Sequence, residues 1–185
     1  MFAVFAPMTS ILVGLVALPP VVGVDGVMHR PLVEARGKPV AFIFISHDCP
    51  VCNTYAPEIG RIESKYRGRV GIDIVYSEPG LTRAQALAHA KEFSIGKATL
   101  LLDTDREFAA ACNARVTPEA IVFDSTGRAV YDGRIDDRYL ALGRQLAAPT
   151  THDLTLALDA VLAHQKPKPA AGEPVGCFII LPHKT

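Results

Sequence analysis

The sequence feature that most constrains the fold of this chain is a C-x-x-C pair directly after a short apolar segment. Segment 39–46, PVAFIFIS, is rich in β-branched and aromatic residues and too short for a core helix, which predicts a buried central strand. Apolar residues then recur at intervals of three or four, the pattern of an amphipathic helix over 50–66. Cys49 and Cys52 are therefore predicted where a strand gives way to the N-terminus of a helix.

That position indicates redox chemistry. Unpaired N–H groups and the positive end of the helix dipole favour an anion at a helix N-terminus, and a thiolate is such an anion. Cys49 is predicted to be an exposed nucleophile with a lowered pKa, and Cys52 lies within one turn, able to close a disulfide with it. Pro50 suits the first helical position, where its missing N–H group would have no partner. A structural zinc site is disfavoured because no second C-x-x-C or C-x-x-H pair follows at ligand spacing. A purely structural disulfide is disfavoured because closing so short a loop contributes little entropic stabilisation.

The rest of the chain alternates between strand and helix patterns. Pro57 is expected to kink the first helix and Gly68 to follow its end. The hairpin turn Ser-Thr-Gly-Arg joins the last two strands. Strands that alternate with helices require parallel pairing through right-handed crossovers, and the hairpin adds antiparallel strands. The chain is therefore predicted to form an α/β sandwich around a mixed sheet, with further strands at 69–78, 98–103, 120–124 and 129–133 and further helices at 82–95, 105–114 and 153–164.

The length and charge of the chain limit its organisation. A chain of 185 residues suits one domain, here predicted over 27–165, and a formal net charge of zero gives no electrostatic case for nucleic acid. Residues 1–26 are interpreted as a signal peptide or hydrophobic N-terminal segment, although they lack a basic n-region. The alternatives are a membrane tether through residues 1–24 or an ordinary apolar N-terminus. We expect an exported, periplasmic or envelope location, or a cytoplasmic one if the segment is not a signal.

With the cysteines placed on this order of elements, the chain resembles the thioredoxin-fold superfamily over 38–164. The features that carry the resemblance are the CPVC motif, Pro57 five residues after its second cysteine, and Thr117-Pro118 ahead of the strand EAIVFD. The resemblance implies a thioredoxin-like three-layer sandwich with a cis bond before Pro118, beside the disulfide, where Thr117 offers backbone groups to substrate. The predicted helix 82–95 resembles the redoxin branch, which includes the AhpC/TSA group and the envelope thiol-disulfide oxidoreductases.

The chain departs from that family at two positions near the cysteines. Asp48 stands where the family has a tryptophan, and Ile43 stands where thioredoxin has a buried acid. A protonated His47 would lower the pKa of Cys49, whereas Asp48 would raise it. Both residues are equally compatible with a solvated loop.

The leading functional hypothesis is thiol-disulfide exchange with a protein partner. The Cys49 thiolate attacks a disulfide of the partner, and Cys52 resolves the mixed disulfide. An upstream reductant or oxidant is expected, but no cofactor beyond the redox-active disulfide and no metal. The direction of exchange stays open, because reducing and oxidising members of the family share the motif.

A peroxidase with antioxidant activity is the first alternative. Ser46 and Cys49 match the Ser/Thr-x-x-Cys element of peroxiredoxins, and Arg115 is a candidate guanidinium for such a site. Phe42 stands where that family has a proline, and a second cysteine three residues after the first is unusual for it.

Copper binding or delivery without catalysis, in the manner of Sco-type proteins, is the second alternative. Soft thiolates and an imidazole suit Cu(I), so Cys49 and Cys52 with His47 or His183 are candidate ligands. The Sco spacing, however, has three residues between the cysteines rather than two.

Two further cysteines stand apart from the motif. Cys112 lies in an apolar helical segment and is expected to be a core thiol. Residues 166–185 comprise a linker, expected to be extended and mobile, and an apolar tail containing Cys177. The tail is expected to dock as an edge strand or on the core. Cys177 is also a candidate third redox cysteine that accepts the disulfide from Cys49.

Overall fold

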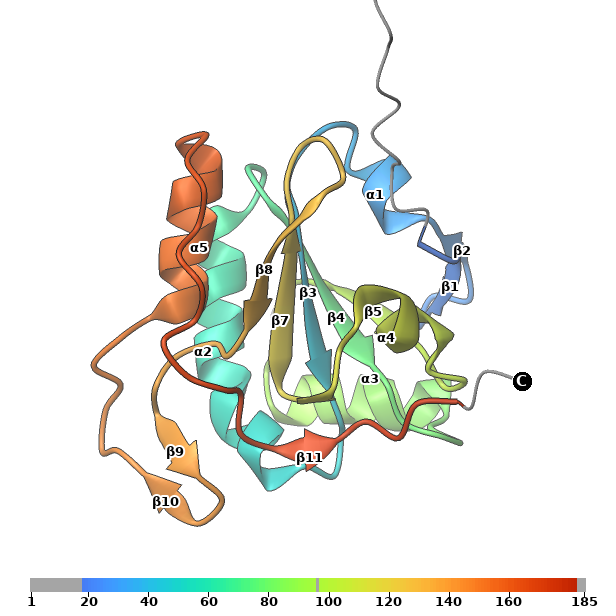
Figure 1. The fold of residues 1–185 in the computed structure, drawn as a ribbon. Helices are drawn as coiled ribbons and strands as arrows, with labels where there is room; N and C mark the ends of the chain where they lie inside the picture. Colours follow the sequence, from blue (N-terminus) through green and yellow to red (C-terminus); the bar gives the residue numbers. More distant parts are fainter. Residues whose placement is uncertain (1–17, 96, 183–185) are drawn as a thin grey trace, which may run out of the picture.

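The computed structural model describes residues 18–95 and 97–182. Within these residues, a seven-stranded mixed sheet of order β2-β1-β5-β4-β3-β7-β8 carries helices on both faces (Figure 1). The predicted α/β sandwich around a mixed sheet is thus confirmed. The elements in chain order are β1 (Val21–Gly23), β2 (Met28–His29), α1 (Pro31–Glu34), β3 (Val40–Ile45), α2 (Pro50–Tyr66), β4 (Gly71–Tyr76), α3 (Arg83–Glu92), β5 (Thr99–Leu102), α4 (Glu107–Cys112), β6 (Val116–Thr117), β7 (Glu119–Phe123), β8 (Ala129–Gly133), β9 (Tyr139–Ala141), β10 (Arg144–Gln145), α5 (Asp153–Leu162) and β11 (Cys177–Phe178).

Strand β3 lies at the centre of the sheet. It pairs in parallel with β4, from Val40 opposite Gly71 to Ile45 opposite Tyr76, and antiparallel with β7. All six of its residues are buried, because helices cover both faces of the sheet, and this explains its continuous apolar run. The end of β3 leads directly to the first cysteine of the motif.

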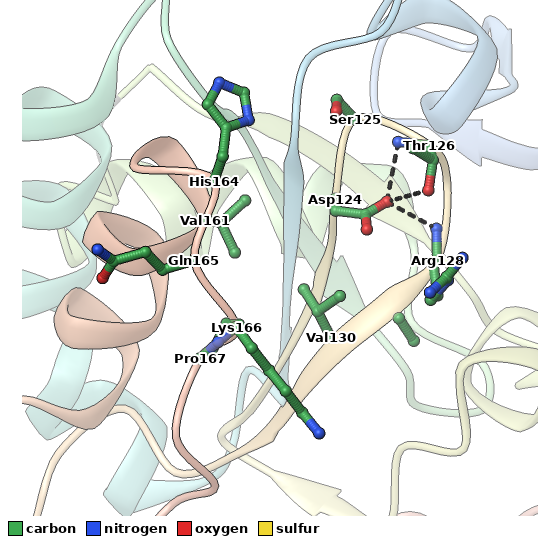
Figure 2. A pocket seen from close by; sticks show the side chains of 11 residues that line it. Asp124, Ser125, Thr126, Arg128, Val130, Val161, His164, Gln165, Lys166 and Pro167 are labelled. Carbon is green, nitrogen blue, oxygen red and sulfur yellow. Dashed lines mark hydrogen bonds between the residues drawn. The ribbon is translucent and has the colours of Figure 1, made fainter.

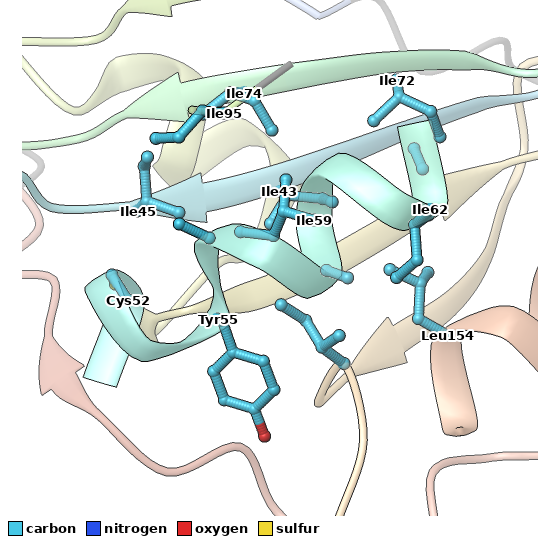
Figure 3. Close-up of a cluster of buried hydrophobic side chains, with 14 of the residues drawn as sticks. Ile43, Ile45, Cys52, Tyr55, Ile59, Ile62, Ile72, Ile74, Ile95 and Leu154 are labelled. Atoms are coloured by element: carbon cyan, nitrogen blue, oxygen red, sulfur yellow. The ribbon is translucent and has the colours of Figure 1, made fainter. Parts of the chain in front are cut away.

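Helix α2 packs on one face of the sheet through its apolar stripe (Figure 3). Ile59 and Ile62 are fully buried against Ile43 of β3 and Leu154 of α5. Burial of each such side chain contributes about 1.5–3 kcal/mol to the stability of the fold. This packing holds the helix N-terminus at the end of β3.

The opposite face of the sheet is covered by α4. Phe42 of β3 meets Phe108 of α4 edge to face, with ring centroids 5.0 Å apart. Cys112 is buried in this second cluster, and burial raises the pKa of its thiol well above the ordinary value. The expectation of a core thiol is confirmed.

The folded domain begins before the predicted boundary at residue 27. β1 pairs antiparallel with β5, Val22 lying opposite Leu102, and β2 pairs antiparallel with β1. β1 has only three residues, and they continue the apolar stretch before them, so the sequence pattern did not distinguish them as a strand. Residues 1–17 lie outside the described part of the chain, so the signal peptide stays a prediction. No helix in the described ranges is both long and apolar enough to cross a membrane.

After α5 the chain returns along the outside of the domain to the end of the sheet that carries the cysteines (Figure 1). The N–H group of Ala171 donates to Asp153 at 3.1 Å, and Glu173 forms an ion pair with Arg115 at 3.3 Å. Contrary to the expectation of a mobile linker, this segment is fastened to the domain. The tail then docks as β11, a strand beside β6, as expected.

Candidate active site at the end of the central strand

The CPVC motif lies where β3 ends and α2 begins. Cys49 is the N-cap residue of α2, with φ −83° and ψ 112°, and Pro50 is the first helical residue. The first helical hydrogen bond runs from Asn53 N–H to the carbonyl oxygen of Cys49, at 3.0 Å. The predicted junction of strand and helix N-terminus is found here.

The cysteines of the motif are covered rather than open to solvent. Cys49 is 1% exposed and Cys52 is 2% exposed. The Sγ atom of Cys49 lies 3.2 Å from the Sγ atom of Cys177 and 3.5 Å from the carbonyl oxygen of Thr117. The prediction of an exposed nucleophile is therefore wrong for this conformation, because the C-terminal strand lies over it. The structure brings together three of the four cysteines, all as free thiols.

The electrostatics assign different roles to the three thiols. The pKa of Cys49 is lowered to about 5, chiefly by a hydrogen bond from the Cys52 thiol. Burial opposes this shift, whereas backbone N–H groups at the start of α2 and the Cys177 thiol add to it. Burial and the adjacent Cys49 raise the pKa of Cys52 well above its usual range. At neutral pH the negative charge thus belongs to Cys49.

The thiol of Cys177 has the opposite character from that of Cys49. Its pKa is raised to about 11, first by burial and then by its contact with Cys49. The charge of Asp48 adds to the increase. Asp48 therefore acts on Cys177, a role that the sequence did not suggest. A neutral Cys177 thiol is a hydrogen-bond donor to the Cys49 sulfur.

A second loop faces the cysteines from the start of β7. The peptide bond between Thr117 and Pro118 is cis, and Thr117 is buried. Glu119 is fully buried and accepts hydrogen bonds from the N–H groups of Arg115, at 2.5 Å, and Val116, at 3.2 Å. Glu119 was not among the predicted site residues, although a charged residue at the start of an apolar strand is a signal of such a role.

The loop 46–48 is tied to a carboxylate that the sequence analysis also missed. The backbone N–H group of His47 donates to Glu78 at 2.8 Å, and the imidazole of His47 contacts the same carboxylate. The hydroxyl of Ser46 donates to Asp48 at 2.6 Å and to Glu78. Glu78 follows β4, whose carboxyl end meets that of β3 at one edge of the sheet. Topology would have pointed to this residue.

The remaining sequence candidates lie elsewhere. The Arg115 guanidinium is engaged with Glu119, at 3.2 Å, and with Glu173. His183 lies outside the described residues. The described part of the chain has two groups of potential metal ligands, and neither includes a cysteine: His47, Asp48 and Glu78, and Glu58, Asp136 and His152.

A surface pocket of about 640 Å³ lies at the other end of the sheet (Figure 2). Its floor includes the β7–β8 turn, where Asp124 accepts hydrogen bonds from the backbone N–H groups of Thr126 and Arg128. Asp124 follows Phe123, which pairs with Val40 at the start of β3, whereas the cysteines follow its end. The pocket is thus separate from the cysteine site, and the carboxylate of Asp124 stabilises the β7–β8 turn.

Residues 31–142 match the family model of the thioredoxin-like domain. No curated protein matches the chain. A hypothetical protein from Sinorhizobium meliloti 1021 has a similar structure, with a TM-score of 0.77 at 22% identity over 91% of this chain and 93% of that one. An uncharacterized conserved protein from Geobacillus kaustophilus gives 0.77 at 24% identity over 91% and 92%. A secreted disulfide oxidoreductase from Mycobacterium tuberculosis, homologous to E. coli DsbE, gives 0.56 at 16% identity over 80% and 97%.

At these identities the similar structures support the fold. The family model covers more than half of the 185 residues, including both cysteines of the motif and the cis-proline loop. The chain belongs to the thioredoxin-like domain family.

Proposed function

We propose that this protein is a thiol-disulfide oxidoreductase that exchanges disulfides with a protein partner through its CPVC motif. The observation that carries the proposal is the position of Cys49 as the N-cap residue of α2 with Cys52 in the first turn of that helix, where the pKa of Cys49 is lowered to about 5 and that of Cys52 is raised. The thiolate is the nucleophile in disulfide exchange. Thr117 and Pro118 line the same site.

In the proposed reaction the Cys49 thiolate attacks one sulfur of a partner disulfide. The partner bond breaks, a partner thiolate leaves, and a mixed disulfide forms. The negative charge of Cys49 then disappears, which removes one of the causes that raise the pKa of Cys52. Cys52 loses its proton, attacks the Cys49 sulfur and releases the second partner thiolate. Two electrons pass to the partner, and the reverse sequence oxidises a partner dithiol without any cofactor.

The low pKa of Cys49 favours the oxidising direction. A stabilised thiolate stabilises the reduced protein, which makes its disulfide a better oxidant. We therefore expect the partner to be a protein dithiol that receives the disulfide, with an upstream oxidant to regenerate the Cys49–Cys52 bond.

A trapping experiment tests the role of Cys49. The double variant C52A/C177A retains the nucleophile but lacks both neighbouring thiols. Incubated with oxidised glutathione, it is expected to accumulate a glutathione adduct at Cys49, seen by mass spectrometry. The triple variant that also carries C49A is the control and should gain none at this site. No adduct on the double variant would remove the basis of the proposal.

The two alternatives make different predictions in simple assays. The hydroxyl of Ser46 is hydrogen-bonded to carboxylates, and the guanidinium of Arg115 is engaged in ion pairs. Neither side chain is therefore free to bind a peroxide. Consumption of hydrogen peroxide at the rate of disulfide exchange would support the peroxidase alternative. Copper bound stoichiometrically after purification, and lost in C49A, would support copper delivery.

An exported location fits this chemistry, because disulfides persist in oxidising compartments. Signal-peptide cleavage must leave Val21–Gly23 in place, since these residues form β1 of the sheet. N-terminal sequencing of the mature protein from the native host is expected to find a start before Val21. A start after Gly23 would contradict this expectation.

A further inference from the structure

The C-terminal strand β11 lies directly on the cysteine site. It pairs antiparallel with β6, Cys177 opposite Thr117 and Phe178 opposite Val116. The Thr117 hydroxyl donates to the carbonyl oxygen of Cys177 at 3.4 Å, and the N–H group of Ile179 donates to the carbonyl oxygen of Arg115, the residue before β6, at 2.9 Å. The tail thus uses backbone groups of the cis-proline loop that would otherwise be open to a partner strand.

Side chains of the tail alternate between the domain and solvent. Ile179 is buried in the core cluster that also holds Phe108, whereas Phe178 is 83% exposed and Ile180 is 78% exposed. Successive side chains of a strand point to opposite faces, so Cys177 lies on the same face as Ile179, although Cys177 is still exposed to solvent. Ile179 thereby fixes the register that aims Cys177 at the site.

Gly176 permits the close approach of the tail to the cis-proline loop. A Cβ atom built on Gly176 would stand 1.8 Å from the carbonyl oxygen of Thr117, a backbone atom that has no freedom to turn away. Any larger residue at this position would push the strand off the site. The glycine is an observation independent of the sulfur contact, and both place the tail on Cys49.

We propose that Cys177 is a third redox-active cysteine and that segment 174–181 is a built-in exchange partner, which forms a disulfide with Cys49. This inference rests on the proposed function of the CPVC motif. The sulfur atoms of Cys177 and Cys49 are 3.2 Å apart, so they must move about 1 Å closer to form a disulfide bond.

The exchange balances without an additional reagent. When Cys49 carries a mixed disulfide, Cys177 loses its proton to solvent and attacks the Cys49 sulfur. The bond to the partner breaks, and the partner leaves as a thiolate. From the Cys49–Cys52 disulfide, the same attack releases Cys52 as a thiolate, which takes up a proton. The first reaction completes the oxidation of the chain, whereas the second only moves an existing disulfide.

The arrangement regulates access to the nucleophile. With the tail docked, Cys49 is 1% exposed, so a protein partner reaches it only when β11 leaves β6. A Cys49–Cys177 disulfide would lock the tail in place until Cys52 attacks Cys49 and releases it. Cys52 therefore acts as the group that reopens the site.

A comparison of C52A with C52A/C177A tests the proposal. Each reduced variant is mixed with oxidised glutathione, quenched with acid at intervals and analysed by mass spectrometry after digestion. In C52A the glutathione adduct should be transient and replaced by a cross-linked peptide pair containing Cys49 and Cys177. In C52A/C177A the adduct should persist. An adduct that persists equally in both overturns the third-cysteine proposal but leaves the proposed function standing, whereas no adduct in the double variant defeats the proposed function itself.

A second variant tests whether docking of the tail is responsible. C52A/G176A retains Cys177 but removes the close approach to Thr117, and undocking lowers the effective concentration of the thiol. The attack of Cys177 on the glutathione adduct of Cys49 should slow by about tenfold or more. The matched control is C52A/F178A, which alters the neighbouring outward side chain and should resolve at the rate of C52A. Equal rates in C52A and C52A/G176A would contradict a role for the docked strand.

Discussion

The carboxylate of Glu78 accepts a hydrogen bond from the backbone N–H group of His47, at 2.8 Å, and contacts the imidazole of the same residue. Glu78 follows β4 and His47 precedes Cys49 by two residues, so one acid fastens the loop that carries the nucleophile to the neighbouring strand. The hydroxyl of Ser46 donates to this carboxylate as well. The position of Cys49 thus depends on the sheet as well as on its own helix.

Removal of this carboxylate should destabilise the fold. In Glu78→Ala the N–H group of His47 loses its acceptor in a partly buried place, and the hydroxyl of Ser46 keeps only Asp48 as a partner. We expect the free energy of unfolding to fall by about 1–3 kcal/mol, measured by urea denaturation. Glu92→Ala, on the exposed end of α3, is the control and should change it by less than about 0.5 kcal/mol. Equal effects of the two variants would refute the anchoring role of Glu78.

The reactivity of Cys49 should depend on pH in the way expected of a thiol with an unusually low pKa. Hydrogen bonds from Cys52 and from the helix N-terminus hold its pKa at about 5, against 9.0 for an unperturbed thiol. Alkylation of Cys49 by iodoacetamide, followed by mass spectrometry of the reduced protein, should be half-maximal near pH 5. A midpoint above about pH 7 would show that the thiolate is not stabilised in this way.

Substitution of Cys177 should shift that midpoint. The Cys177 thiol donates a hydrogen bond to the Cys49 sulfur and is one of the causes that lower the pKa of Cys49. Cys177→Ala removes the donor, so the alkylation midpoint should rise, whereas Cys177→Ser keeps a donor and should leave it lower than in the alanine variant. If the alanine and serine variants titrated alike, the contact would have no influence on the thiolate.

The same pKa predicts how the stability of the reduced protein varies with pH. Cys49 has a lower pKa in the folded protein than in the unfolded chain, so the unfolded chain binds more protons between about pH 5 and 9. The contribution of Cys49 is fully present above the unfolded value and is lost as the pH falls towards 5. The difference in unfolding free energy between the reduced wild type and C49S should therefore grow from pH 5 to pH 9. A difference independent of pH would contradict the shift.

The core under α2 should be sensitive to truncation. Ile59 is fully buried between the helix and the sheet, and its loss leaves a cavity that close-packed neighbours fill only in part. Ile59→Ala is expected to cost about 2–5 kcal/mol of unfolding free energy. Leu156, on the outer face of α5, is 62% exposed, and Leu156→Ala should cost much less. Similar losses from the two variants would show that the assigned core is incorrect.

The strongest periodic patterns predicted the fold best. The apolar run of β3 and the spacing of three and four in α2 placed both elements, because a central strand and an amphipathic helix express their burial in local sequence. The pattern did not separate β1 from the stretch before it, since three residues carry no period and pairing with β5 is a tertiary contact. The two-residue strand β6 was not predicted for the same reason, whereas the apolar tail that contains β11 was expected to dock as an edge strand or on the core.

The site was predictable where its chemistry is local. Cys49 and Cys52 follow from their spacing and from their place at a helix N-terminus. Glu78 enters the site through the sheet, because its partner His47 lies 31 residues earlier in the chain. Glu119 enters through a turn, and only its charge at the start of an apolar strand marks it in the sequence. The burial of Cys49 could not be foreseen either, because it comes from Cys177, which lies 128 residues further along the chain.

The most direct test of the account is the reduction potential of the Cys49–Cys52 couple, measured in C177A so that the third thiol does not compete. The fraction of oxidised protein is followed across a series of glutathione buffers. We predict a reversible two-electron couple between about −270 mV, the value of thioredoxin, and about −120 mV, that of a strong oxidant. No reversible couple, or a potential below about −300 mV as in structural disulfides, would contradict the claim that the CPVC motif exchanges disulfides.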